Sequence, residues 1–227
     1  MNVVITGANR GLGLGFVKHY LALGHEVWAC YRSDLAGLAE LASDKLHTVT
    51  LDVSQDFDAD GFDVGQGFPN SIDLLINNAG IYGPYKNKQN FEHITSAAML
   101  EVFNVDCLGP LRVAQQLRKR VINAKGTIAN LSSKMGSSED NTSGGAYAYR
   151  AAKAALVIVS KSMAVDLEPL GVKVITLHPG WVTTDMTHQT GLIDVATSVA
   201  GMTKVIANID KYDLGAFVAF DGQVVPF

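Results

Sequence analysis

The stretch NVVITGANRGLG, residues 2–13, decides the fold. Residues 2–6 form a short apolar run typical of a buried strand, and a helical pattern follows from 12 to 23 with Gly24 as its stop. Between them lie Gly7, Gly11 and Gly13. Glycine lets the backbone turn tightly and approach a pyrophosphate, while free amides at a helix N-terminus favour its negative charge. The stretch predicts a dinucleotide site, although its spacing is G-x-x-x-G-x-G rather than the usual G-x-G-x-x-G.

The rest of the chain alternates between apolar runs and helical patterns. We expect strands at 26–31, 46–51, 72–77, 126–131, 172–177 and 215–220, and helices at 35–42, 95–121, 147–167 and 194–207. Between Asp52 and Ile72 the many glycines and aspartates predict only a short or irregular helix. Strands that alternate with helices imply a parallel sheet covered on both faces, because parallel neighbours need crossover connections.

Length and composition indicate one soluble domain. The 227 residues suffice for one sizeable core, and no apolar run reaches the ~20 residues of a membrane span. A formal net charge of −4 offers no electrostatic reason to expect nucleic acid or an anionic membrane as partner. Cys30 and Cys107 show no metal-ligand spacing, so we expect no metal site and a reducing compartment. With the first strand beginning at Asn2, there is no room for a signal peptide, and we expect a cytoplasmic protein.

The stretch YAYRAAKAAL, residues 147–156, contains two tyrosines and one lysine on an expected helix. Residues four apart share a helix face, so Tyr149 and Lys153 lie together. Tyr147 lies about 200° round the helix from Tyr149. The spacing therefore favours Tyr149 for chemistry. By itself such a pair is more often a packed ring beside a solvated amine.

Four motifs in order carry a resemblance to a known family: TGANRGLG, then NNAG at 77–80, NLSS at 130–133 and YRAAK at 149–153. With these the chain resembles the short-chain dehydrogenase/reductase family over almost its whole length. The stretch SGGAYAYRAAKAAL and the ending DGQVVPF look most like its C-factor or carbonyl-reductase-like branch. The resemblance implies a single domain over residues 1–227, a Rossmann-type doubly wound α/β sheet of about seven strands, and a nicotinamide cofactor.

The resemblance also implies a catalytic set: Asn104, Ser133, Tyr149 and Lys153. Reducing a carbonyl requires a hydride on carbon and a proton on oxygen, and a phenol with a pKa near 10 can donate that proton. We expect Lys153, together with the positive charge of the oxidised cofactor, to lower this pKa. We expect Ser133 to hold the substrate oxygen, and Asn104 to help hold a water that relays protons from Lys153. Alone, Ser133 could equally cap a turn and Asn104 could be an ordinary helix residue. Because the span from Ser133 to Tyr149 is longer than is usual in the family, the Ser133 assignment also requires that residues 137–146 loop out without displacing it.

The end of the second expected strand indicates the cofactor. An acid there normally binds the adenosine ribose of NAD, but this chain has Tyr31 followed by Arg32. Arg32 and Arg10 can pair with a 2′-phosphate, which favours NADP(H) over NAD(H); the alternative is that both are merely solvated. The cofactor contacts that the resemblance implies are Gly7, Asn9, Arg10, Gly11, Leu12, Gly13, Tyr31, Arg32, Asp52, Val53, Asn78, Ala79, Gly80, Tyr149, Lys153, Pro179, Gly180, Val182 and Thr184. We interpret His178, which precedes Pro179-Gly180, as structural.

These features predict an NADP-dependent oxidoreductase that reduces an aldehyde or ketone to an alcohol. A short segment at 187–200 indicates an open pocket for small or varied carbonyl or alcohol substrates. The alternative is a dinucleotide-binding regulatory or signalling protein with little turnover; a sugar-nucleotide epimerase is disfavoured by the chain's length.

We also predict a homodimer or homotetramer, because Val157 and Ile158 make the helix at 147–167 apolar opposite its Leu156 side.

Overall fold

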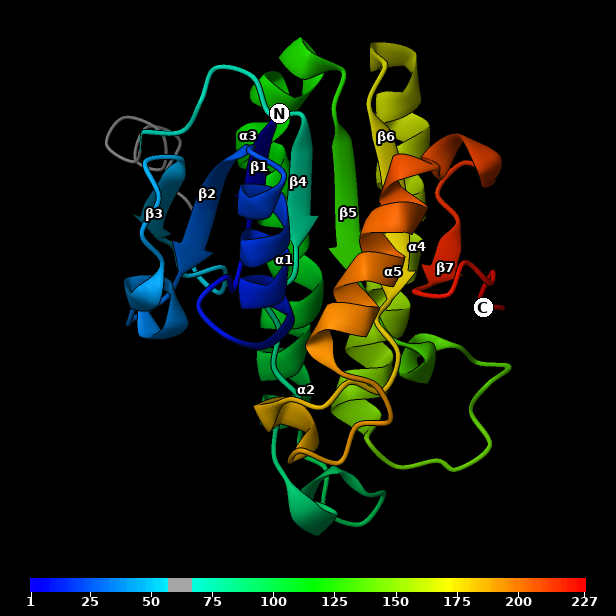
Figure 1. The fold of residues 1–227 in the computed structure, drawn as a ribbon. Coiled ribbons are helices and arrows are strands. Elements are labelled where there is room, and N and C mark those ends of the chain that lie inside the picture. Colours follow the sequence, from blue (N-terminus) through cyan, green and yellow to red (C-terminus); the bar gives the residue numbers. More distant parts are fainter. Residues whose placement is uncertain (57–66) are drawn as a thin grey trace.

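The apolar runs form one parallel sheet in a computed structural model that describes residues 1–56 and 67–227, without the side chains at positions 86 and 87. Its strands are β1 (Asn2–Ile5), β2 (Glu26–Tyr31), β3 (Leu46–Thr50), β4 (Leu74–Asn77), β5 (Thr127–Leu131), β6 (Lys173–His178) and β7 (Phe217–Ala219). The order is β3-β2-β1-β4-β5-β6-β7, with every pair parallel. Strand order therefore reverses between β1 and β4, the place where such sheets bind ligands beyond their carboxyl ends. In Figure 1 these ends point downward.

Helices cover both faces of the sheet (Figure 1). α1 (Gly11–Ala22) and α5 (Val195–Ala207) lie on one face, while α3 (Gly109–Ala124) and α4 (Tyr147–Leu167) lie on the other. α2 (Ser96–Phe103) precedes α3 and extends beyond the carboxyl edge. Successive strand residues point to opposite faces, so a strand buried on both sides reads as an unbroken apolar run. This explains why the strands could be recognised in the sequence.

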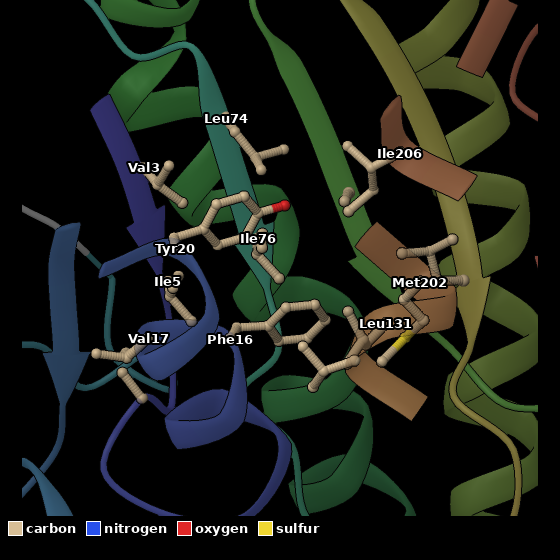
Figure 2. Packing of buried hydrophobic residues seen from close by; sticks show 14 of the residues in the cluster. Val3, Ile5, Phe16, Val17, Tyr20, Leu74, Ile76, Leu131, Met202 and Ile206 are labelled. Carbon is tan, nitrogen blue, oxygen red and sulfur yellow. The ribbon is translucent and has the colours of Figure 1, made fainter. Parts of the chain in front are cut away.

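The core under α1 and α5 shows how this burial fixes the helices. Phe16 and Met202 are fully buried and belong to one cluster with Ile5, Ile76 and Leu131 of the sheet. Figure 2 shows Phe16 beside Ile76 and Leu131, with Met202 of α5 close to it. Because α1 packs here, the turn that precedes it is held at the carboxyl edge of β1.

Two expected helices differ from what the structure shows. The helix expected at 35–42 is a short 3-10 helix, Ala36–Glu40, because Ala36 takes a left-handed φ of 40° and Leu41 is already extended. The helix expected at 95–121 is interrupted by a π-turn, Asn104–Leu108, where the Gly109 N–H donates to the Asn104 carbonyl five residues back. Pro110 has no N–H to donate, which favours this irregular turn.

The other strands and helices lie close to where the sequence predicts them. Every expected strand is present with its bounds shifted by at most two residues, and α4 and α5 match the expected helices. The irregular helix expected between Asp52 and Ile72 falls mostly on residues 57–66, outside the described residues. Within the described ranges, no helix combines the length and the apolar character needed to cross a membrane.

We predict that Phe16→Ala lowers the free energy of unfolding by about 3–5 kcal/mol, because it leaves a cavity under α1. Leu23 lies just after the same helix and is 59% exposed, so Leu23→Ala is the matched control and should change stability by no more than about 0.5 kcal/mol. Denaturant unfolding of both variants measures the difference. Equal losses would mean that α1 is not held by this core.

Candidate active site

The glycine turn between β1 and α1 presents bare backbone at the carboxyl edge. Gly7 and Gly11 take left-handed φ values of 61° and 52°, which glycine adopts without strain. A Cβ on Gly13 would lie 2.1 Å from the Gly7 carbonyl oxygen, so no side chain fits there. Such a turn followed by a helix N-terminus fits the pyrophosphate of a dinucleotide.

The loop after β4 is hydrogen-bonded to this turn. The Asn78 amide donates to the carbonyl oxygens of Thr6 and Gly7 at 2.9 and 3.0 Å. The Thr6 hydroxyl accepts from the backbone N–H groups of Asn78 and Ala79, both at 3.0 Å. These four contacts hold the glycine turn and the NNAG loop together as one wall of the site.

A buried chain of polar side chains joins the sheet to α4. The Asn77 amide donates to the Asn130 side-chain oxygen at 2.8 Å, and the Asn130 amide donates to the Ser160 hydroxyl at 2.9 Å. Ser160 in turn donates to the Leu156 carbonyl one turn earlier. Because buried polar groups need partners, this chain fixes how α4 lies on β4 and β5.

Tyr149 and Lys153 face the cleft from α4. Lys153 is 5% exposed; its ammonium donates to the Leu131 carbonyl at 3.0 Å and lies 5.6 Å from the centre of the Tyr149 ring. Tyr147 is 39% exposed and packs near Phe91, with ring centres 6.3 Å apart. The structure thus brings Tyr149, and not Tyr147, together with Lys153.

Ser133 lies beside Tyr149 despite the insertion that separates them. Its hydroxyl hydrogen-bonds the Tyr149 phenol and also accepts from the Met135 N–H at 3.2 Å, which caps a short turn. Capping this turn is therefore compatible with a position beside Tyr149. The inserted loop is held by the Arg150 guanidinium, which donates to the Met135 carbonyl at 3.2 Å and to the Ser143 hydroxyl at 2.9 Å. It loops away and leaves Ser133 in place.

His178 lies at the end of β6, behind the Ser133 turn. Its Nδ1 accepts from the Lys134 N–H at 3.2 Å. Burial, with Lys134 nearby, lowers the pKa of His178 to about 4, so the ring is neutral near pH 7. This contact agrees with a structural role.

The position of Asn104 is a correction to the expected catalytic set. Its amide donates to the Ser54 carbonyl at 2.9 Å, so the side chain is engaged there and not at Lys153. Asp106 takes the place beside the lysine: Oδ2 lies 3.1 Å from the Lys153 ammonium and Oδ1 accepts from the Ile81 N–H at 2.8 Å. The π-turn shifts which residues face α4, and the sequence reasoning missed this. The available signal was an acidic residue within an apolar helix, which needs a buried partner.

Burial and charge act against each other in this cluster. Burial raises the pKa of Tyr149, and Asp106 adds to this, while Lys153 and the Ser133 hydrogen bond lower it; the net shift is upward. Burial would lower the pKa of Lys153, but Asp106 and Tyr149 outweigh it and raise the pKa. Burial raises the pKa of Asp106 against the effect of the ammonium. Lys153 thus lowers the phenol pKa as expected, and burial with Asp106 outweighs it when the positive charge of an oxidised cofactor, which the expectation also included, is not counted.

One cleft of about 1290 Å³ runs from the glycine turn to Tyr149. This exceeds the range of about 300–1,000 Å³ usual for one small ligand, so a dinucleotide and a substrate can share it. The expected cofactor residues that line it are Gly7, Asn9, Arg10, Gly11, Leu12, Arg32, Asp52, Val53, Asn78, Ala79, Gly80, Tyr149, Lys153, Pro179 and Thr184. Four others do not: Gly13, Tyr31, Gly180 and Val182. Among the residues that the structure describes, no group of His, Cys, Asp or Glu is placed to hold a metal ion.

The two arginines at the adenosine end differ in their surroundings. Arg32 lines the cleft. Burial raises the pKa of the nearby Asp52, but the Ser54 hydrogen bonds and the charge of Arg32 outweigh burial, so the pKa of Asp52 is lowered overall. Arg10 lies 3.6 Å from Asp185 across the cleft, with both side chains about 70% exposed to solvent. Such an exposed pair contributes little, so the Arg10 guanidinium remains available to a phosphate.

Aromatic side chains line the other end of the cleft, a feature the sequence reasoning did not identify. The Tyr82 ring centre is 5.0 Å from that of Tyr149 and 5.7 Å from that of Tyr85, which it stacks on. Tyr85 in turn lies 4.8 Å from the His188 ring. The space beside Tyr149 is therefore bordered by flat, amphipathic groups.

Comparison with known proteins agrees with this arrangement. A family model described as short chain dehydrogenase matches residues 1–193. The C-signal of Myxococcus xanthus is 40% identical over 157 residues, which cover 69% of this chain and 93% of that protein. The carbonyl reductase Sniffer of D. melanogaster superposes with a TM-score of 0.89 at 30% identity, covering 100% of this chain and 99% of that one. The NADPH-bound carbonyl reductase from chicken fatty liver superposes with a TM-score of 0.87 at 33% identity, covering 100% and 98%.

Proposed function

The chain belongs to the short-chain dehydrogenase family, and we propose on this basis that it is an NADP(H)-dependent oxidoreductase that reduces an aldehyde or ketone to an alcohol. The observation that carries the proposal is the pairing of Tyr149 and Lys153 on the wall of a cleft that begins at the glycine turn, with Ser133 beside Tyr149. Measuring NADPH oxidation with a panel of aldehydes, ketones and quinones tests it.

Each residue of the cluster has a part in this chemistry. A bound reduced nicotinamide cofactor supplies the hydride for the carbonyl carbon. Ser133 hydrogen-bonds the carbonyl oxygen and holds it against Tyr149, which donates its proton. The Lys153 ammonium stabilises the phenolate that remains. Because the net pKa of Tyr149 is raised, the phenol is protonated at neutral pH and ready to act as an acid.

We assign the cofactor preference to Arg32. Its guanidinium lines the adenosine end of the cleft, and no acid stands at the tip of β2. A guanidinium binds a phosphate through charge-assisted hydrogen bonds, which NAD(H) lacks at the 2′ position. The NADPH in the chicken carbonyl reductase supports the same choice.

A regulatory or signalling protein with little turnover is the second candidate, raised by the 40% identity to a protein named C-signal but not favoured over the enzyme. The substrate panel separates the two. Turnover of any carbonyl with saturation kinetics supports the enzyme, whereas tight NADPH binding without turnover supports the regulator. The aromatic border of the cleft makes flat carbonyl compounds the first substrates to try.

We place the protein in the cytoplasm because Cys30 and Cys107 are both free and buried, as a reducing compartment allows. Cell fractionation tests this assignment. Recovery of the chain from a secreted fraction would contradict it.

We predict that Tyr149→Phe lowers turnover by at least ~10²-fold, because it removes the acidic hydroxyl and keeps the ring. NADPH affinity and melting temperature should change little. Tyr147→Phe is the matched control: the same edit two residues away, on a side chain that points to solvent, should leave turnover within a few-fold. An inactive Tyr147→Phe beside an active Tyr149→Phe would refute the assignment.

We predict that Arg32→Asp weakens NADPH binding far more than NADH binding. The change removes the phosphate partner and installs a charge that repels the 2′-phosphate. Fluorescence titration with each cofactor measures the two dissociation constants. Equal losses for both would mean that Arg32 does not contact the 2′-phosphate.

We propose self-association through α4, with one correction to the reasoning from sequence. Val157 is covered by this chain's own Phe217, Ala219 and Val225, so it is not available to a partner. Ile158 and Val165, seven residues apart on one helix face, are 53% and 52% exposed. We predict a dimer or tetramer in sedimentation, and Ile158→Lys should weaken it. A species of only 24.2 kDa at micromolar protein would exclude it.

A further inference from the structure

Asp106 is a fully buried acid that the mechanism above does not use. It is 0% exposed and lies in the π-turn between α2 and α3. A buried carboxylate is unfavourable unless it is paired and hydrogen-bonded. Its position therefore calls for a physical explanation.

Two contacts compensate this burial, and both lead to the catalytic cluster. Oδ2 pairs with the Lys153 ammonium at 3.1 Å, and Oδ1 accepts from the Ile81 N–H at 2.8 Å. A Cβ added to Gly80 would lie 3.3 Å from Oδ1 and 3.4 Å from the ammonium, so the bare backbone of the NNAG loop closes over the pair. Asp106 thus joins the cofactor loop to the lysine that serves Tyr149.

The charges around Tyr149 come from several elements. Lys153 on α4 favours the phenolate, and the Ser133 hydroxyl after β5 does so by hydrogen bonding. Asp106 in the π-turn and Tyr82 after β4 disfavour it. Cys107 faces Lys153 from the same turn, but its pKa is raised to about 11, chiefly by burial, so it stays neutral. Asp106 is therefore the negative charge that offsets the ammonium.

We propose that Asp106 is a positioning residue that holds the Lys153 ammonium and keeps Tyr149 in its proton-donating form through neutral and mildly alkaline solution. The inference rests on the proposed function, in which Tyr149 acts as the acid. An ammonium without this partner would favour the phenolate, which cannot protonate a carbonyl. With the pair in place, the cluster keeps its proton until the pH is well above neutral.

The direct test titrates the phenol without cofactor or substrate. Tyrosinate absorbance is recorded against pH for the wild type and for Asp106→Asn, each as a difference from the same protein carrying Tyr149→Phe. Removing the negative charge stabilises phenolate relative to phenol, so the Tyr149 signal should move to lower pH by at least ~1 unit, the low end for a neighbouring charge. An unchanged or higher midpoint would overturn the proposal.

Carbonyl reduction gives a second reading. The phenol must be protonated to donate, so kcat/KM falls as pH rises through its pKa, and this alkaline limb should move to lower pH in Asp106→Asn. Cys107→Ser is the matched control. Cys107 adjoins Asp106 in the same turn and is also buried but uncharged, so the alkaline limb of this variant should stay at the wild-type position. A limb that moves equally in both variants would indicate a structural disturbance and would overturn the proposal.

One further measurement, together with the absorbance titration, separates the possible failures. If Asp106→Asn does not fold, wild-type protein with carbon-13 at its aspartate carboxyls reports whether Asp106 is ionised at neutral pH; a protonated Asp106 would overturn the inference. If no carbonyl is turned over at all, the proposed function fails, while the absorbance titration still tests the effect of Asp106 on Tyr149.

Discussion

The ammonium of Lys153 is buried, and its need for partners organises the carboxyl edge of the sheet. Removing a cation from water is costly unless a counter-charge and hydrogen-bond acceptors replace the solvent. Here the partners come from three elements. They are the Leu131 carbonyl of β5, the Asp106 carboxylate of the π-turn and the Tyr149 ring of α4, the helix that also carries Lys153. A change in any of these elements alters the charge beside the phenol. The site is therefore one electrostatic unit rather than a set of separate residues.

The scaffold places this unit by burying polar groups as well as apolar ones. The core under α1 and α5 holds the glycine turn, while the Asn77–Asn130–Ser160 chain holds α4 against the sheet. The two hydrogen bonds of this chain, at 2.8 and 2.9 Å, are buried, so the helix has little freedom to rotate or slide. The glycine turn and Tyr149 are thereby fixed to the same sheet, close to the point where strand order reverses.

The same cluster shows how burial and charge combine to set the protonation state of Tyr149. A lysine beside a tyrosine suggests a phenol that ionises easily, but here burial and Asp106 outweigh the lysine. A protonated phenol suits carbonyl reduction, since the acid is present before the substrate arrives. The aromatic rings of Tyr82 and Tyr85 complete the space in which that substrate would lie.

The sequence by itself determined the strands, the glycine turn and the placing of Tyr149 rather than Tyr147 beside Lys153, because each is encoded locally. Doubly buried strands read as unbroken apolar runs, glycine permits the tight turn, and residues four apart share a helix face. Only the tertiary structure decided that Asp106, and not Asn104, reaches Lys153, since one π-turn rotates the residues that follow relative to a regular helix. It likewise showed that Val157 is covered by the chain's own C-terminal strand. The direction of the Tyr149 pKa shift also required it, because that shift sums burial and charges from segments far apart in the chain, and no local pattern encodes their distances.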